Sequence, residues 1–288
     1  MGLKLHHRLG MVLLSVAAPG RLARVMVRPH SQKMEGTLET SGRVERVSYP
    51  ADGGVVCRGW WITPASTAAD RCIVLAHGWT SHGLRMAGFV EPLLGLGYQV
   101  LIYNARSHGD SDPFPICTVV QFTEDAAAAL RYALSRVERV SVLGHSLGAA
   151  ATLVAVADGA PVERVVAIAP PSHPVAAMAE MLDRQGVPGQ LMVRRVGHHV
   201  QRAVGRSFAS VAPELRMRDI ACPVLLVHGS ADEVVGVSHF DRLCQAAGPN
   251  VETLLVDGAN HDSVKHAPET MARIMGFLGG GASSLPGR

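Results

Sequence analysis

The hydrophobic positions of residues 44–280 alternate between short continuous apolar runs and longer stretches with helical spacing. Eight runs rich in Val, Ile and Leu predict strands at 44–49, 55–62, 72–76, 99–103, 140–143, 165–169, 224–228 and 253–256. Strands that alternate with helices predict a mostly parallel eight-stranded sheet with helices on both faces, because parallel strands covered on both faces consist of continuous apolar runs. The first two runs have no helix between them, which predicts an antiparallel start to the sheet.

Helical spacing of apolar residues predicts helices near 85–95, 123–137, 147–157, 235–247 and 267–278. One interval breaks this rhythm, because about fifty residues separate the sixth and seventh strands, whereas most connections have about two to six. We therefore expect a helical cap inserted after the sixth strand. The predicted division is a basic and apolar helical extension (1–40), an α/β core (41–170 and 219–280), the cap (171–218) and a flexible tail (281–288).

Within the expected cap, Val193, Val196, Val200 and Val204 recur every three or four residues and predict an apolar stripe on one helix. Arginine and histidine residues lie between them. The stripe either lines a pocket for an acyl chain or seals the cap onto the sheet, and the sequence leaves both interpretations open.

The composition restricts the class of protein. The chain has 288 residues, of which 48% are hydrophobic and 18% are charged, and this balance excludes a disordered or collagen-like chain. The net charge of +3 is too small to indicate a nucleic-acid partner, which requires Lys and Arg clustered on one face.

The chain has an odd number of cysteines and no C-x-x-C pair, which favours free thiols in a reducing, cytoplasmic compartment. No metal-ligand spacing occurs among them, so we expect no metal site. The five are Cys57, Cys72, Cys117, Cys222 and Cys244.

The first thirty residues fit more than one role: packing on the protein, contact with a membrane, or export. An apolar run at 9–18 follows Lys4 and Arg8, which is the beginning of a signal-peptide pattern. However, the run is about half the length that crosses a bilayer. Pro19 also follows Ala17 and Ala18 directly, at the position where a signal peptide would be cleaved. A basic amphipathic helix fits the same residues. The alternatives, in order of preference, are packing on the protein body, peripheral membrane contact and export.

Residues 144–148, Gly-His-Ser-Leu-Gly, match G-x-S-x-G and lie directly between a predicted strand and a predicted helix. The motif requires this context, because a tight strand-to-helix turn makes the Ser146 hydroxyl project from the sheet edge. Glycine on both sides lets the neighbouring backbone pass without a Cβ clash. The helix that follows points free N–H groups toward developing negative charge. We therefore predict that Ser146 is a nucleophile.

A serine hydroxyl needs a base, and the base needs an orienting carboxylate. Asp232 comes four residues after the seventh predicted strand, and His261 comes five residues after the eighth. Both lie at the carboxyl ends of strands, the edge where open α/β sheets bind ligands. The order Ser146, Asp232, His261 therefore predicts three partners on one rim.

Other residues compete for these roles. Glu233 is the nearest substitute for the acid, and Asp183 in the cap is a remote one. His266 and His239 compete with His261 for the role of the base. Asp232 also fits an ordinary helix cap, since Asp is common before an apolar run.

The third predicted strand leads into His77-Gly78-Trp79, a strand followed by a tight turn. We expect the backbone N–H of Trp79 to face the N–H of Leu147 across the serine. Two such donors form an oxyanion hole, in which each donor contributes about 3 kcal/mol of transition-state stabilisation.

These residues resemble the α/β-hydrolase fold family over positions 44–278. The resemblance is carried by His77-Gly78, by residues 144–148, by Asp232 in H-G-x-x-D and by His261 in G-x-x-H. It implies a catalytic triad of Ser146, Asp232 and His261, with Trp79 and Leu147 as the oxyanion hole.

Residues 104–111, Asn-Ala-Arg-Ser-His-Gly-Asp-Ser, are similar to the D-x-R-G-x-G-x-S loop that braces the His-Gly turn in that family. Asn104 and Ser107 depart from the pattern, so it does not predict the bracing here.

The resemblance implies a cofactor-independent serine hydrolase acting on a small-molecule carboxylic ester or thioester. A serine nucleophile argues against dehalogenase and epoxide hydrolase members, which use aspartate. Peptidase, acyltransferase and perhydrolase activities use the same triad and stay open. A non-catalytic protein that binds a hydrophobic ligand is the alternative from another class.

Overall fold

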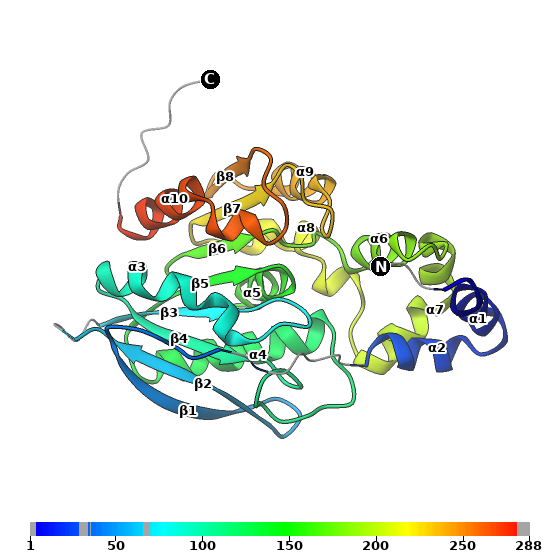
Figure 1. The fold of residues 1–288 in the computed structure, drawn as a ribbon, viewed down its shortest axis with the longest axis horizontal. Coiled ribbons are helices and arrows are strands. Elements are labelled where there is room, and N and C mark those ends of the chain that lie inside the picture. The colour runs from blue at the N-terminus through cyan, green and yellow to red at the C-terminus, as the bar shows by residue number, and fades with distance from the viewer. Residues whose placement is uncertain (1–3, 29–33, 35, 66–69, 281–288) are drawn as a thin grey trace.

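The eight strands expected from the sequence form one sheet in the order β1-β2-β4-β3-β5-β6-β7-β8, as Figure 1 shows. The computed structural model describes residues 4–28, 34, 36–65 and 70–280. β2 pairs antiparallel with β1 and β4, and the other neighbouring pairs are parallel, which confirms the predicted sheet. The strands are β1 (Arg43–Ala51), β2 (Val55–Thr63), β3 (Arg71–Ala76), β4 (Gln99–Asn104), β5 (Arg139–His145), β6 (Val165–Ile168), β7 (Val224–Gly229) and β8 (Val251–Val256).

Helices occupy the intervals that the hydrophobic spacing predicts. They are η1 (Gly83–Phe89, a 3₁₀ helix), α3 (Val90–Gly95), α4 (Val119–Leu134), α5 (Leu147–Ala157), α9 (Val237–Ala246), η4 (Ser263–His266, a 3₁₀ helix) and α10 (Pro268–Leu278). α4 begins four residues before the predicted position 123, because Thr118 Oγ1 accepts the N–H of Val120 at 3.2 Å and caps the helix there.

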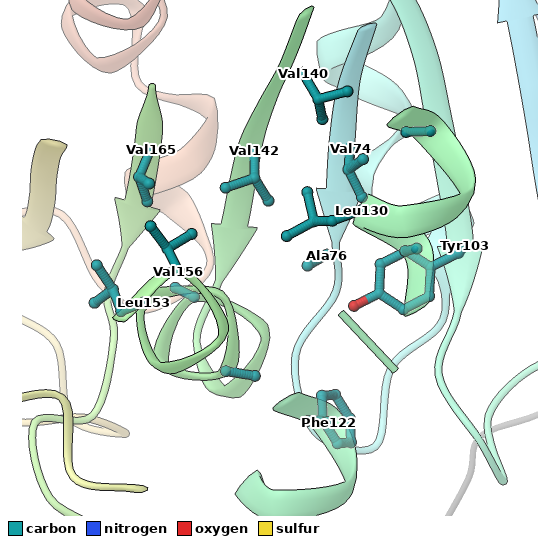
Figure 2. Close-up of a cluster of buried hydrophobic side chains, with 14 of the residues drawn as sticks. Val74, Ala76, Tyr103, Phe122, Leu130, Val140, Val142, Leu153, Val156 and Val165 are labelled. Atoms are coloured by element: carbon teal, nitrogen blue, oxygen red, sulfur yellow. The ribbon is translucent and has the colours of Figure 1, made fainter. Parts of the chain in front are cut away.

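Two buried apolar clusters cover opposite faces of the sheet. One joins β3 and β5 to α4, with Val74 and Val142 packed beside Leu130 (Figure 2). The other joins the intervening residues of the same strands, including Ile73 and Leu143, to α3 and α10. Successive side chains of a strand point to opposite faces, so the central strands need apolar residues at every position. This explains their continuous Val, Ile and Leu runs.

The edge strands follow a different pattern. β6 and β7 are buried along their whole length, whereas β8 buries only Val256 and β1 buries alternate residues near its end. The polar positions of β1 and β8 therefore reflect their places at the two edges of the sheet.

The connection between β6 and β7 is helical. It contains α6 (Pro174–Arg184), α7 (Gly189–Val204), η2 (Ala209–Val211, a 3₁₀ helix), α8 (Pro213–Arg216) and η3 (Met217–Asp219, a 3₁₀ helix). The N-terminal extension forms α1 (Leu5–Ala17) and α2 (Pro19–Met26), which pack against α7 at one end of the molecule (Figure 1). A third apolar cluster joins these helices and contains Leu22, Ala23, Val27, Ala179, Leu182, Val187, Met192, Val193, Val196 and Val200.

The valine stripe of α7 is buried, but in neither of the two places expected. Val193, Val196 and Val200 pack in the third cluster with residues of α2 and α6. Val204 is half-buried and also contacts the cluster between α4 and α5. The stripe therefore joins the N-terminal helices to the segment after β6, because regular spacing reveals a buried face without revealing what covers it.

All five cysteines are free thiols. Cys57, Cys72 and Cys117 are buried and the other two are half-buried. Burial raises the pKa of the Cys57 and Cys72 thiols well above the ordinary value. These buried thiols are therefore inert core residues.

None of the described helices is long and apolar enough to cross a bilayer. The tail predicted to be flexible, residues 281–288, lies outside the described residues.

A buried ion pair ties the loop after β4 to α4. Arg106 Nη2 and Nε lie 2.7 and 2.9 Å from Asp125 Oδ1, and the Arg106 backbone N–H donates to Asp125 Oδ2 at 2.7 Å. The side chains are 1% and 0% exposed. Three hydrogen bonds from one residue therefore replace the water that the Asp125 carboxylate loses on burial.

Replacing Arg106 with Met should lower the free energy of unfolding by about 3–5 kcal/mol, because Asp125 would stay buried without its cationic partner. Urea denaturation followed by circular dichroism measures this loss. Arg131→Met is the matched control, because the Arg131–Asp52 pair is 59% and 62% exposed and contributes much less. Equal losses in the two variants would contradict this interpretation.

Candidate active site

Ser146 occupies the turn between β5 and α5 in a backbone conformation that few residues adopt. Its φ is 55° and its ψ is −125°, and such strain at a residue with a Cβ costs about 1–3 kcal/mol. The Ser146 N–H donates to the Ile168 carbonyl of β6 at 2.8 Å, and its carbonyl accepts the Ala150 N–H of α5 at 3.1 Å. The strand and the helix therefore hold the strained turn, as a G-x-S-x-G turn requires.

Glycines let this turn approach the turn after β3. A Cβ at Gly148 would lie 2.3 Å from the His77 carbonyl oxygen, and a Cβ at Gly144 would lie 2.6 Å from the backbone of α5. A Cβ at Gly78 would lie 3.0 Å from Ser146 Cβ. The two turns therefore pack backbone to backbone, and side chains at these glycines would separate them.

The structure brings Asp232 and His261 together from the loops after β7 and β8. Asp232 Oδ2 lies 2.7 Å from His261 Nδ1, the length of a charge-assisted hydrogen bond. Gly229 lets the loops meet, since a Cβ there would lie 2.2 Å from the Ala259 carbonyl oxygen. The Asp232 side chain is fully buried, whereas 13% of the His261 side chain is exposed.

The Asp232 carboxyl group is held in its ionised form. Burial alone would raise its pKa, but the hydrogen bond from His261 and the N–H groups of Val235 and Val234 outweigh burial and lower it. Both N–H groups lie 2.8 Å from Asp232 Oδ1. An ionised carboxylate accepts the Nδ1 proton of His261, and this assigns Nε2 as the unprotonated nitrogen that can act as a base.

His145 contacts His261 from the strand side. Its Nε2–H donates to the His261 carbonyl at 3.0 Å, and the two ring centroids lie 4.8 Å apart. Burial lowers the pKa of His145 to about 3, so the ring is neutral at neutral pH. The sequence does not predict this contact, because position 145 is an unspecified residue of the G-x-S-x-G motif. The only sign of the contact in the sequence is that a histidine occupies that position.

Ser146 is the residue next to His145, which places it beside the Asp232–His261 pair. Among the described residues, its Oγ makes no hydrogen bond to the His261 ring. Hydrogen bonds between a nucleophile and its base are often long in sites without substrate. The structure thus joins acid to base directly and holds the serine in the adjacent turn.

The backbone N–H groups of Trp79 and Leu147 donate no hydrogen bond to another described residue. Leu147 begins α5, where the first N–H groups of a helix lack partners within the helix. Trp79 follows Gly78, the residue that abuts Ser146. These two backbone donors, which have no partner among the described residues, therefore belong to the residues that directly follow Ser146 and Gly78.

The loop after β4 braces the His-Gly turn although its sequence departs from the family pattern. The Ala105 N–H donates to His77 Nε2 at 3.0 Å, and His77 Nδ1–H donates to the Gly78 carbonyl at 2.8 Å. Burial lowers the pKa of His77 to about 3, so its neutral ring accepts the Ala105 N–H. The backbone makes this contact, so the substitutions at Asn104 and Ser107 leave it intact.

Asn104 and Ser107 make contacts of their own. Asn104 Oδ1 accepts the Gly83 N–H at 2.7 Å, and its Nδ2 donates to Asp110 Oδ1 at 2.8 Å. Ser107 stands where the pattern has glycine and has a φ of 61°. Its Oγ accepts the Phe114 N–H at 2.7 Å, which helps to offset this strain.

The competing histidines lie away from Ser146. His239 is buried, and its Nδ1 accepts the Ser172 N–H at 3.0 Å while its Nε2 lies 3.2 Å from Glu180 Oε2. His266 ends η4 beside Gly88. Their contacts are therefore with other parts of the fold.

The two other candidates for the acid, Asp183 and Glu233, are placed differently from Asp232. Asp183 Oδ1 accepts the Gly189 N–H at 2.8 Å at the beginning of α7. Glu233 is exposed. Within the described ranges, no group of three His, Cys, Asp or Glu side chains is placed to hold a metal ion.

Two clefts lie away from the Asp232–His261 pair. One of about 410 Å³ is lined by residues of α4 and α5, among them Glu124 and Asp158. The other, of about 480 Å³, is open and is lined by the end of α7 and the loop after it, including His198 and Arg202. Neither includes a residue of the candidate site.

The sequence comparisons give a family match and distant relatives. Residues 67–205 match the family described as serine aminopeptidase, S33. An uncharacterised protein of Mycobacterium tuberculosis is 25% identical over 214 residues, which are 73% of this chain and 69% of that protein. The uncharacterised protein YfhR of Escherichia coli is 24% identical over 242 residues, covering 81% and 80% of the two chains. The family match includes Trp79 and Ser146 but ends before Asp232 and His261.

Solved structures share the fold. An esterase of Pyrococcus furiosus aligns with 88% of this chain and 98% of its own, with a TM-score of 0.69 and 24% identity. The esterase domain of a Rhodothermus marinus protein aligns with 82% of this chain and 96% of its own, with a TM-score of 0.59 and 24% identity. Together with the family match over residues 67–205, these structures show that the chain has the α/β-hydrolase fold.

Adding one methyl group at Gly148 and one at Gly276 should change stability in opposite directions. Gly148→Ala should destabilise the protein by about 1–3 kcal/mol, because its Cβ would overlap the His77 carbonyl oxygen. Gly276→Ala should stabilise it by about 0.4–1 kcal/mol, since that helical position is open. Urea denaturation measures both, and a neutral Gly148→Ala would contradict the close approach of the two turns.

His145→Gln should make stability less sensitive to acid. Between pH 6.5 and about 3 the unfolded chain protonates His145 and the folded chain does not, so stability falls as the pH falls. One such group contributes about 1.4 kcal/mol per pH unit to that slope. Urea denaturation at several pH values between 4 and 7 should show the variant's slope reduced by this amount, and an unchanged slope would refute the buried neutral state.

Proposed function

We propose that this chain is a serine hydrolase that cleaves a small-molecule carboxylic ester or thioester through an acyl-enzyme intermediate. The observation that carries the proposal is the 2.7 Å hydrogen bond between Asp232 and His261 beside the strained turn of Ser146. A nucleophile next to an imidazole that a buried carboxylate orients is the arrangement that activates a serine hydroxyl.

In the first half of the reaction, His261 Nε2 takes the proton of Ser146 Oγ as that oxygen attacks the substrate carbonyl carbon. The imidazolium then gives this proton to the leaving alcohol or thiol, and the acyl group stays on Ser146. In the second half, His261 takes a proton from water as the water oxygen attacks the acyl carbon. The proton passes to Ser146 Oγ as the carboxylic acid leaves, while Asp232 stays ionised throughout.

The oxyanion of each tetrahedral intermediate would accept hydrogen bonds from the N–H groups of Trp79 and Leu147. Both groups are unpaired among the described residues. They are backbone groups, so no side-chain movement is needed when charge develops. Each is expected to contribute about 3 kcal/mol to transition-state stabilisation.

The helices after β6 fit the role of a cap over this site. α6 and α7 lie beyond the carboxyl ends of β5 and β6 in Figure 1. The cap would comprise residues 171–218, between core segments 41–170 and 219–280. Its shape would select the acyl chain and the leaving group.

We propose an ester substrate rather than an amide because several solved structures with this fold are esterases. The Pyrococcus furiosus and Rhodothermus marinus proteins are an esterase and an esterase domain, and a further neighbour of this fold, Est1E from Butyrivibrio proteoclasticus, holds ferulic acid. A peptidase is the second candidate, because residues 67–205 match a family described as a serine aminopeptidase. Hydrolysis rates on nitrophenyl esters and on aminoacyl nitroanilides separate the two activities.

A fluorophosphonate probe tests the nucleophile without a known substrate. We expect intact-mass analysis to show one adduct on the wild type, mapped to Ser146, and none on Ser146→Ala. His261→Ala should slow labelling by about 10³-fold or more because the base is lost. His266→Ala is the matched control and should label like the wild type.

The outcomes separate the candidates. An adduct that persists in Ser146→Ala would place the reactive group elsewhere. Slow labelling of His266→Ala with normal labelling of His261→Ala would overturn the assignment of the base. A folded wild type that takes up no probe would favour the non-catalytic alternative, in which the site only binds a hydrophobic ligand.

A further inference from the structure

The outward face of α1 carries a stripe of large apolar side chains, which is unusual for a surface helix. Leu9, Leu13 and Val16 are 55%, 68% and 63% exposed and form one stripe, because residues spaced by four and three share a helix face. Ser15, by contrast, is buried, and its Oγ donates to the Val12 carbonyl at 2.6 Å. His6 and His7 are also exposed, and Met11, Val12 and Leu14 pack against the third apolar cluster. α1 therefore carries large apolar side chains on both its inner and its outward face.

Arginines cover the outward faces of the two helices that pack beside α1. Arg21 and Arg24 of α2 are exposed and flank Val25, which is 51% exposed. On α7 the exposed positions lie opposite the buried valine stripe, and they include Leu191, Arg194, Arg195, His198 and Arg202. Each of these basic faces therefore also presents one large apolar side chain.

The charge of the chain is strongly segregated onto this end of the molecule. Residues 4–28 and 174–213, which contain α1, α2, α6 and α7, carry ten of the 27 Lys and Arg but only Glu180 and Asp183 of the 24 Asp and Glu. The rest of the chain therefore holds 17 cations against 22 anions. The modest net charge of +3 conceals a basic helical end on an acidic body.

We propose that these helices form a docking face for the surface of an anionic lipid bilayer. The docking face consists of Leu9, Leu13 and Val16 of α1, Arg21 and Arg24 of α2, and Arg194, Arg195 and Arg202 of α7. α1 lies at the outer edge of the molecule, with α2 and α7 beside it (Figure 1). This position leaves the stripe accessible to a flat surface.

A bilayer matches both chemistries of the docking face. Acyl chains take up the apolar stripe of an interfacial helix, and anionic headgroups attract the arginines around it. α1 has 13 residues, too few to cross a bilayer, so it would lie in the interface. A nucleic acid would leave the apolar stripe in water, and a second copy of the chain would bring arginines against arginines.

Co-sedimentation of the full chain with vesicles tests the proposal without relying on the reaction at Ser146. We expect binding to phosphatidylglycerol–phosphatidylcholine vesicles at low salt, much weaker binding to pure phosphatidylcholine, and release as salt is added. The combined variant Leu9→Gln, Leu13→Gln and Val16→Gln should lower the partition coefficient at least about tenfold.

A second variant reverses two charges of the docking face and leaves the apolar stripe intact. Arg194→Glu with Arg195→Glu should also lower binding about tenfold or more, because two attractive charges become repulsive.

Two control variants change residues outside the docking face. Arg43→Glu with Arg218→Glu makes the same change of net charge at exposed positions. Leu215→Gln with Leu255→Gln is the control for lost apolar surface, at side chains 58% and 46% exposed. Both controls should bind like the wild type.

Three results would overturn the proposal. They are no binding to anionic vesicles at low salt, equal binding by the docking-face variants and their controls, and a lipid-free dimer that the α1 variant abolishes. The last would assign the apolar stripe to a second copy of the chain. Sedimentation equilibrium without lipid detects that dimer.

Discussion

The close approach of the turn after β5 to the turn after β3 places Ser146 directly beside Gly78. At Gly148 a side chain would enter the space of the His77 carbonyl oxygen, and at Gly78 it would press on Ser146. This contact joins segments about seventy residues apart in the chain, and Trp79, whose N–H has no partner among the described residues, directly follows Gly78. The strained Ser146 lies on one side of this contact, and His77, which the Ala105 N–H braces, lies on the other.

Burial separates the ionisable groups around Ser146 into neutral and charged ones. His77 and His145 lose their hydration and gain mainly backbone partners, so their pKa values fall to about 3. Their neutral rings then serve as fixed donors and acceptors for the backbone. Asp232 also loses hydration, but His261 and two backbone N–H groups hold its charge and lower its pKa. The number of hydrogen bonds to the charged form thus decides which buried groups stay ionised.

The N-terminal helices give the segment after β6 a core of its own. α1 and α2 join α6 and α7 around the third apolar cluster, whose described members include no strand residue. A polar network ties the same segment to α9 of the core, in which Ser172 donates its N–H to His239 and its hydroxyl proton to Glu214. Residues at the beginning of the chain therefore support the helices next to the carboxyl ends of the strands.

The sequence by itself determined the eight strands, their antiparallel start and the helical connection after β6. It also determined which residues stand at the strand ends. These features could be predicted because apolar spacing and the G-x-S-x-G motif are local patterns. The catalytic roles of Ser146 and His261 stay predictions. The tertiary structure decided that helices cover the valine stripe, that the Ala105 backbone braces His77, and that His145 contacts His261. These are contacts between distant segments, and local spacing shows that a face is buried without showing which distant segment buries it.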